Sequence, residues 1–198
     1  MKKYILSCTL ILCSIFVIAQ EEEKVEHDSI LDAAPWGSEF FTFPISFAPA
    51  IPYQGYEEAV FPPGWSNEES PEFWSYVFAW KIDAATPLTT EDFETNLSLY
   101  FDGLMDIQNR KNGSTILATT AAITRDDTIE SIQEYTGTLY LYEGRYTNKM
   151  MTLYTLAEQY YYKKEKQTTV IFRFSPASFD ADIWKSLKGV TLHNDNCD

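Results

Sequence analysis

Histidine, the side chain that most often carries protons and binds metals, is nearly absent: this chain has 2 histidines among 198 residues. His27 lies in an acidic run, and His193 lies near the C-terminus with Asp195 and Cys197 close by. Ser-His-Asp and Cys-His catalysis both need a histidine held by a rigid scaffold between a nucleophile and an acid. Because neither position offers such a scaffold, the sequence predicts no nucleophilic catalytic site and no ordinary zinc site.

Carboxylates are abundant, and a pair of them is the one catalytic device that the composition leaves open. Glycoside hydrolysis needs two acids across a cleft, without histidine or metal. The acids that lie close to aromatic residues are Glu57, Glu58, Glu68, Glu69 and Glu72. Adjacent Glu57 and Glu58 would point to opposite faces of a strand, so they cannot form the pair. A hydrolase using two of Glu58, Glu68, Glu69 and Glu72 is the enzymatic alternative, and no catalytic residue is assigned.

Patterns typical of cofactor binding are missing from the sequence. The acid-rich stretches at 126–127 and 194–196 do not have the alternate spacing of a calcium-binding loop. Asp126 and Asp127 are typical of a turn instead, because Asp bonds its own backbone there. No glycine-rich phosphate loop is present. We therefore expect neither a cofactor nor a metal.

The most unusual feature is the aromatic content, since Phe, Trp and Tyr make up 16% of the residues. Most of these large rings are expected to pack in the core. Trp65 follows the turn Pro62-Pro63-Gly64, and a ring in such a loop is the one we expect to contact a ligand. The other candidate ligand-binding residues are Trp36, Tyr161, Glu68 and Glu72, because an exposed aromatic patch usually marks a binding site.

These residues favour a non-enzymatic binding domain whose partner is a small molecule, a glycan or an envelope protein. Ring stacking and apolar burial would supply the affinity, and a few polar groups would fix the orientation. Besides the hydrolase, a structural or assembly subunit of the envelope is an alternative. An open sheet edge or a flat aromatic patch would favour that alternative.

Hydrophobic periodicity predicts the elements that must position these side chains. Residues 73–83 alternate with a period of two, with Trp74, Tyr76, Phe78, Trp80 and Ile82 on one face, which predicts a strand. A helix with a hydroxyl cap and first-turn acids is expected to follow Pro87 and to end near Gly113. Its apolar residues recur at spacings of three and four.

The frequent prolines before residue 64 predict only short extended pieces, such as 39–43 and 56–61, laid against the sheet by their rings. The remaining pattern predicts antiparallel strands at 115–124, 129–142, 150–162 and 168–175, and a second helix at about 179–188. The connections between the later strands are too short for crossover helices, so neighbours should pair antiparallel. The fold class is therefore α+β, a twisted antiparallel sheet of about five to seven strands with two amphipathic helices on one face or on both. A lipocalin-like β-barrel is the alternative.

The N-terminus has the pattern of a signal peptide, with Lys2 and Lys3 before an apolar run and a cleavage site after Ala19. A disordered acidic tail at 20–28, a single domain at 29–193 and a loose tail at 194–198 are expected to follow. Cleavage would leave Cys197 as the only cysteine, so no intramolecular disulfide is expected.

The net charge is −14, from 15 Lys and Arg and 29 Asp and Glu. Because a phosphate backbone needs clustered cations, this balance argues against nucleic-acid binding. After the predicted cleavage no apolar stretch approaches the roughly 20 residues of a membrane helix, so we expect no transmembrane segment in the mature chain.

Three segments, 57–65 (EEAVFPPGW), 72–80 (EFWSYVFAW) and 100–104 (YFDGL), resemble a pattern in uncharacterised secreted proteins of Bacteroidetes-type bacteria. The three segments lie within residues 57–104, which make up roughly a quarter of the chain. It implies an exported bacterial protein, located in the periplasm or outside the cell, and it implies no activity, cofactor or catalytic residue.

Overall fold

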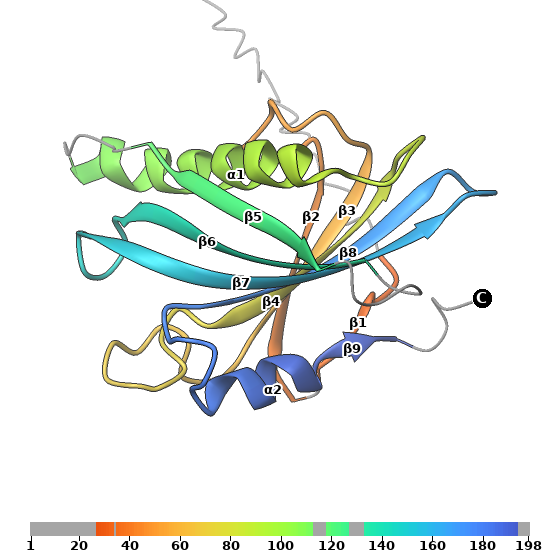
Figure 1. The fold of residues 1–198 in the computed structure, drawn as a ribbon. Coiled ribbons are helices and arrows are strands. Elements are labelled where there is room, and N and C mark those ends of the chain that lie inside the picture. Colours follow the sequence, from red (N-terminus) through yellow and green to blue (C-terminus); the bar gives the residue numbers. More distant parts are fainter. Residues whose placement is uncertain (1–26, 34, 113–117, 127–132, 194–198) are drawn as a thin grey trace, which may run out of the picture.

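A computed structural model of the chain describes residues 27–33, 35–112, 118–126 and 133–193. Its main element is a seven-stranded antiparallel sheet in the order β2-β3-β4-β8-β7-β6-β5 (Figure 1). The strands are β2 (Gly37–Phe43), β3 (Gly55–Phe61), β4 (Tyr76–Asp83), β5 (Thr120–Asp126), β6 (Gln133–Glu143), β7 (Lys149–Tyr162) and β8 (Gln167–Ser175). The sheet is strongly twisted and open, which confirms the α+β prediction and overturns the barrel alternative.

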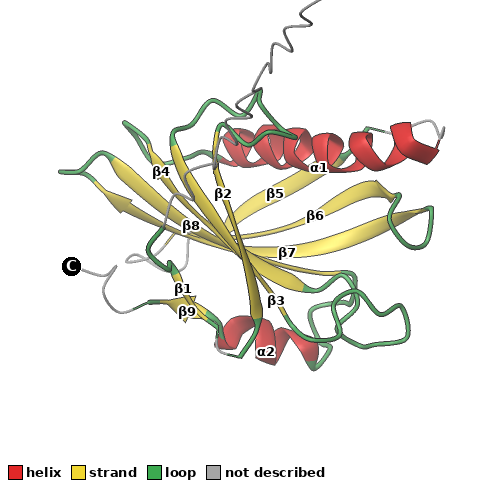
Figure 2. Ribbon diagram, turned by 180° about the vertical axis from the view of Figure 1, so that it is seen from behind, coloured by secondary structure: helices red, strands yellow, loops and turns green. Residues whose placement is uncertain are grey.

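The two helices cover opposite faces of the sheet. Helix α1 (Thr90–Asn112) lies on one side and helix α2 (Ile183–Gly189) on the other (Figure 2). A two-stranded sheet beside α2 joins the ends of the domain, where β1 (Leu31–Asp32) pairs with β9 (Thr191–Leu192). The sequence left open whether the helices cover one face of the sheet or both, and in the structure they cover both.

The period of two along β4 explains why both faces can be covered. Tyr76, Phe78, Trp80 and Ile82 are buried in the core beneath α1. Val77 and Ala79 are buried on the opposite face, where they pack with residues of α2, β1 and β9. The small residues between the aromatic ones thus form a second core instead of a solvent-exposed face.

The start of α1 follows the predicted cap. Thr89 Oγ1 accepts a hydrogen bond of 3.2 Å from the Asp92 backbone N–H, and the Asp92 carboxylate accepts from the Thr89 N–H and hydroxyl at 2.8 Å each. This reciprocal arrangement satisfies donors that the first helical turn leaves free. Phe93, Leu97 and Phe101 then bury one face of α1 against the sheet.

Several predicted boundaries differ from the structure, and the extended pieces expected to lie against the sheet at 39–43 and 56–61 are β2 and β3 of the sheet itself. Strand β4 begins at Tyr76 instead of residue 73, because Trp74 has a left-handed backbone with φ of 53° and Ser75 N–H donates to the Glu72 carbonyl in a turn. Helix α2 begins at Ile183, since Ser178 and Asp180 form a local side-chain hydrogen bond that favours a turn. Strand β5 begins at Thr120, and residues 115–117 lie outside the described residues.

The predicted tails lie mostly outside the described residues as well. Of the predicted acidic tail, residues 27 and 28 are described: the His27 ring stacks on Tyr56 at 4.4 Å, and its Nε2 lies 3.0 Å from the Thr42 hydroxyl. Residues 1–26 and 194–198 lie outside, and so does the predicted signal peptide.

Candidate functional site: an aromatic cavity

A cavity of about 110 Å³ lies between the sheet, α1 and the loop that joins β3 to β4. Its wall is mostly aromatic, with one acid and one base as the charged residues. The lining residues are Glu39, Phe41, Phe47, Ala59, Phe61, Trp65, Trp74, Tyr76, Tyr100, Leu104 and Arg145. We refer to this space as the aromatic cavity.

Strand register brings the floor of the aromatic cavity together. Glu39 is paired with Ala59 across β2 and β3, and both project from the α1 face of the sheet because Phe61, two residues along, does so too. Tyr76 on β4 stacks on Phe61 with ring centroids 5.6 Å apart. Tyr100 lines the cavity from the side of α1.

The loop at 62–75 supplies the two tryptophans of the wall. The Glu72 carboxylate accepts a hydrogen bond of 2.7 Å from the Gly64 N–H, which ties the two halves of the loop together. A β-carbon at residue 64 would meet the Ser70 and Glu72 side chains where they now lie, so a larger residue there would have to displace the Glu72 carboxylate. The Trp74 N–H donates to the Trp65 carbonyl at 2.8 Å, which places the two tryptophans side by side.

Trp74 is exceptional in two respects. Its φ of 53° is a left-handed conformation that is rare for a bulky residue, and such strain concentrates at functional sites. Its side chain is 1% exposed, and its indole Nε1–H has no hydrogen-bond partner within the described residues. A buried donor without a partner is costly, on the order of 1–3 kcal/mol. Trp74 thus lines the cavity and carries an unused donor.

The rim of the cavity is held by the turn between β6 and β7. The buried Glu143 carboxylate accepts hydrogen bonds of 2.5–3.1 Å from the backbone N–H groups of Arg145, Tyr146 and Thr147, and one from the Thr147 hydroxyl. The Tyr146 ring packs edge-on against Trp65 at 6.2 Å. Glu143 therefore fixes the turn that carries Arg145.

Directly behind the cavity lies a buried acid. Glu57 is 0% exposed and accepts hydrogen bonds from the Trp80 indole at 2.6 Å and from the Tyr100 hydroxyl at 2.8 Å. Burial raises the pKa of Glu57 to about 8, although both hydrogen bonds oppose the shift. At pH 7 the carboxyl is therefore mainly protonated. Burial also holds the pKa values of Tyr76 and Tyr100 well above their usual range.

The five candidate ligand-binding residues are not gathered in one place. Trp65 lines the aromatic cavity, and Glu72 lies beneath it as the anchor of the loop. Glu68 is exposed on the same loop. Trp36 lies beside α2 in a separate hollow, and the Tyr161 hydroxyl donates to the Ala85 carbonyl at 2.6 Å. The sequence analysis did not identify Trp74, Glu39 and Arg145 as residues of the cavity. No local sequence pattern shows that an indole lacks a partner, or that residues from distant segments meet at one rim.

The acids of the hydrolase alternative have other partners. The Glu58 carboxylate faces away from the cavity and accepts from the backbone N–H groups of Ile30 and Leu31 at 2.5 and 2.9 Å, which fastens β1 to β3. As the sequence predicted, Glu57 and Glu58 lie on opposite faces. Glu72 holds Gly64, and Glu68 and Glu69 are exposed. Within the described residues, no group of three or more His, Cys, Asp or Glu could hold a metal.

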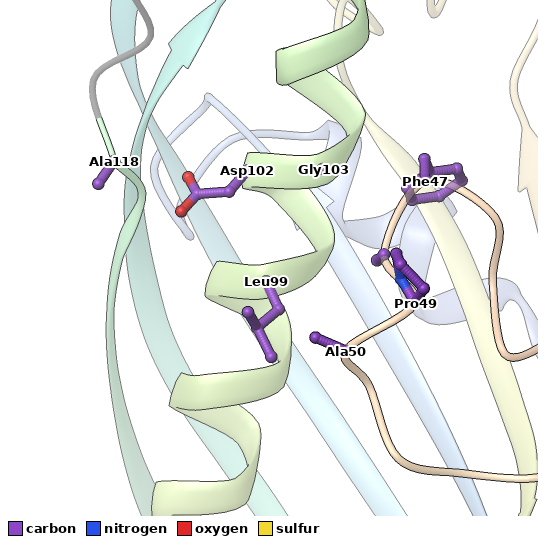
Figure 3. A pocket seen from close by; sticks show the side chains of 8 residues that line it. Phe47, Pro49, Ala50, Leu99, Asp102, Gly103 and Ala118 are labelled. Carbon is purple, nitrogen blue, oxygen red and sulfur yellow. The ribbon is translucent and has the colours of Figure 1, made fainter.

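A wider groove of about 400 Å³ lies on the outer side of α1, between the helix and the 47–50 segment (Figure 3). Its lining is mostly apolar, including Pro49, Ala50 and Leu99. Its acid is already used, since Asp102 accepts a hydrogen bond of 2.6 Å from the Thr119 N–H. The groove has a single aromatic residue, Phe47, in its lining, whereas aromatic residues predominate in the aromatic cavity.

Comparison of the chain with protein-family models, with curated proteins and with solved structures finds no match. Among the helices of the described residues, none combines the length and the apolar character needed to cross a membrane.

Proposed function

We propose that this protein is an exported, non-enzymatic binding domain that holds a small apolar group of its ligand in the aromatic cavity. The observation that carries the proposal is the lining of the cavity, which gathers aromatic rings from the sheet, from α1 and from the 62–75 loop, among them Trp65 and Trp74. Such rings offer a ligand apolar surface and stacking partners. Export rests on the signal-peptide pattern of residues 1–19.

The size of the cavity limits what it can hold. Pockets for drug-sized ligands measure about 300–1,000 Å³, whereas this one measures about 110 Å³. An apolar cavity of about 150 Å³ is known to hold one benzene molecule. Because the aromatic cavity is smaller than that, it suits the end of a short chain or a similarly small group, and the remainder of the ligand would lie across the rim at Glu39 and Arg145.

A carboxylate-dependent hydrolase has less support. Glu58 and Glu72 both serve as acceptors for backbone N–H groups. The one strongly perturbed carboxyl, Glu57, is fully buried and engaged by Trp80 and Tyr100.

The assembly alternative has one observation in its favour. Strand β2 is an edge of the sheet, and within the described residues it pairs only with β3. An edge of this kind can accept a strand from another chain.

The test is tryptophan emission of the purified protein, titrated with oligosaccharides, fatty acids and single-ring aromatic compounds. A saturable change with one class is expected, because Trp65 and Trp74 both line the cavity. Trp65→Ala should weaken that binding and leave the fold intact, while Trp36→Ala, in the separate hollow, should not. Loss of the fold in Trp65→Ala, or no response to any class, would contradict the proposal.

A further inference from the structure

The two edge strands of the large sheet differ in how they are covered. Strand β5 runs alongside α1, and acids of that helix accept hydrogen bonds from the backbone at this edge (Figure 1). Glu94 accepts from the Ile123 N–H at 2.9 Å, and Asp102 accepts from the N–H of Thr119, directly before β5, at 2.6 Å. Because these outer donors are already bonded, β5 is a poor template for a further strand.

Strand β2, at the opposite edge, lacks such cover. In the part of the chain that the structure describes, no hydrogen bond joins the β2 backbone to any segment except β3. All seven residues pair with β3 without a bulge, and none of them is proline or lysine. Bulges, prolines and lysines are the usual devices that protect an edge from pairing. Strand β2 therefore presents backbone N–H and C=O groups that another strand can bond.

Strand β2 also exposes a large aromatic side chain. Phe40 is 39% exposed, and it lies on the α2 face beside the rings of Tyr56 and His27, at 6.5 and 6.0 Å. The strand carries one charge, that of Glu39, which is exposed on the other face. An exposed apolar ring on an unprotected edge is typical of a surface that pairs with another chain.

We infer that two copies of this chain associate through β2, antiparallel about a twofold axis at Phe40, to form one continuous sheet. A twofold axis brings identical strands together antiparallel, which is the orientation of every strand pair in this sheet. Centring on Phe40 lets all seven residues pair, with Ser38 opposite Thr42, and places the two Phe40 rings opposite each other. Aromatic pairs of this kind stabilise a sheet, whereas centring on Glu39 would oppose two carboxylates.

This inference goes beyond the proposed function and is independent of ligand binding. In the same register, Glu39 of one copy faces Phe41 of the other on the α1 face. Both residues line the aromatic cavity, so the cavities of the two copies would lie next to each other at the interface. A dimer that binds none of the probes would leave the inference intact, and a monomer that binds one of them would leave the proposed function intact.

The first test is sedimentation equilibrium of the full chain over a range of protein concentrations, in about 0.15 M and about 0.5 M NaCl. A reversible dimer is expected, and its Kd should be lower at the higher salt concentration. The reason is that each copy carries a net charge of −14, and salt screens the repulsion between the copies. A chain that stays monomeric up to about 1 mM would overturn the inference and leave β2 to a strand of a different protein.

Phe40→Lys places two like charges opposite each other at the axis, and it should raise the Kd of the dimer at least about tenfold. Thr124→Lys is the matched control, because it adds the same charge at an exposed position of β5, the other edge strand. Both variants should keep the fold, since both side chains are exposed at sheet edges, and circular dichroism checks this. Equal Kd values for the two variants would overturn the inference.

Cysteine cross-linking tests the register, in a chain whose native cysteines are replaced by serine. Phe40→Cys should form a disulfide between the two copies. Residues directly opposite on antiparallel strands have Cα atoms about 4.5–5.5 Å apart, which is within the range of a disulfide.

Ser38→Cys is the control for this register, because its two cysteines would lie about 14 Å apart along the strands and should not cross-link. A mixture of Ser38→Cys and Thr42→Cys chains should cross-link, since these residues lie opposite each other. A disulfide between two Ser38→Cys chains, or none in both Phe40→Cys and the mixture, would overturn the inference.

Discussion

The Tyr100 hydroxyl donates a hydrogen bond of 2.8 Å to the Glu57 carboxyl, while the ring of the same tyrosine lines the aromatic cavity. The buried acid is thereby linked to the proposed binding site through one side chain. Trp80 holds the other carboxyl oxygen at 2.6 Å. Glu57 therefore has a defined orientation, and its protonation state affects both the core and the position of Tyr100.

Glu57 should make the stability of the protein fall as pH rises from about 5 to 8. Its pKa is raised from 4.5 to about 8 in the folded state, so unfolding releases a proton in this range. The contribution of Glu57 to the free energy of unfolding is fully present below the pKa of the unfolded state. It decreases by up to about 1.4 kcal/mol per pH unit as pH rises, with a total loss on the order of 5 kcal/mol. Denaturant unfolding at pH 5, 6, 7 and 8 measures this slope.

Glu57→Gln is the matching variant, because its amide can accept from Trp80 and donate to the Tyr100 oxygen without titrating. The variant should gain stability relative to the wild type as pH rises toward 8. The difference between the two proteins isolates Glu57 from the other titrating groups. Parallel pH profiles would show that Glu57 has no raised pKa in the folded state.

Much of the fold is predictable from the sequence, because local patterns determine it. The alternation at 76–82 and the cap at Thr89 lead to β4 and α1 as expected. The two-residue pairing of β1 with β9 is not predictable in this way, since it joins residues 31 and 192 and has almost no local pattern. The strand expected to start at 73 fails for the same reason, because its true start depends on the contact of Trp74 with Trp65.

The candidate site is predictable only in part. Trp65 stands out because it follows a Pro-Pro-Gly turn in an aromatic-rich chain. Arg145 and Glu39 do not, because their positions at one rim depend on Glu143 in another strand and on the register of β2 with β3. Trp36 and Tyr161 show that residue type alone does not predict which residues lie together. Their ring type suggested binding, whereas the structure places them apart from the cavity.

Gly103→Ala should destabilise the protein, although Gly→Ala in an exposed helix normally stabilises it by about 1 kcal/mol. A β-carbon at residue 103 would collide with the Phe47 carbonyl, because α1 and the 47–50 segment approach closely there (Figure 3). We expect a loss of about 1–3 kcal/mol, as for other overpacked sites. Gly189→Ala at the end of α2 is the control, since nothing lies within 4 Å of its added carbon. The measurement is thermal melting of both variants. Equal melting temperatures for Gly103→Ala and Gly189→Ala would contradict the prediction.

Glu143→Ala should loosen the turn that carries Arg145. It removes the acceptor of three backbone N–H groups and of the Thr147 hydroxyl. The expected loss of stability is about 1–3 kcal/mol. Hydrogen exchange of residues 145–147 should accelerate beyond this global effect. Glu165→Ala, in the exposed turn between β7 and β8, is the control and should leave that exchange unchanged. Unchanged exchange in Glu143→Ala would mean that the turn holds without its carboxylate.

Arg173→Met should release α2 from the sheet. Arg173 is 2% exposed, and its guanidinium donates to the carbonyls of Leu187 and Val190 and to the Glu158 carboxylate at 2.8–3.0 Å. Because the Glu158 side chain is 27% exposed, the main cost is the loss of the donor for the two carbonyls, about 1–3 kcal/mol, and quenching of Trp184 emission should increase with it. Lys185→Met is the control, because its ion pair with Asp182 is exposed and contributes at most about 1 kcal/mol. If both variants unfold at the same denaturant concentration, the buried arginine does not fasten α2.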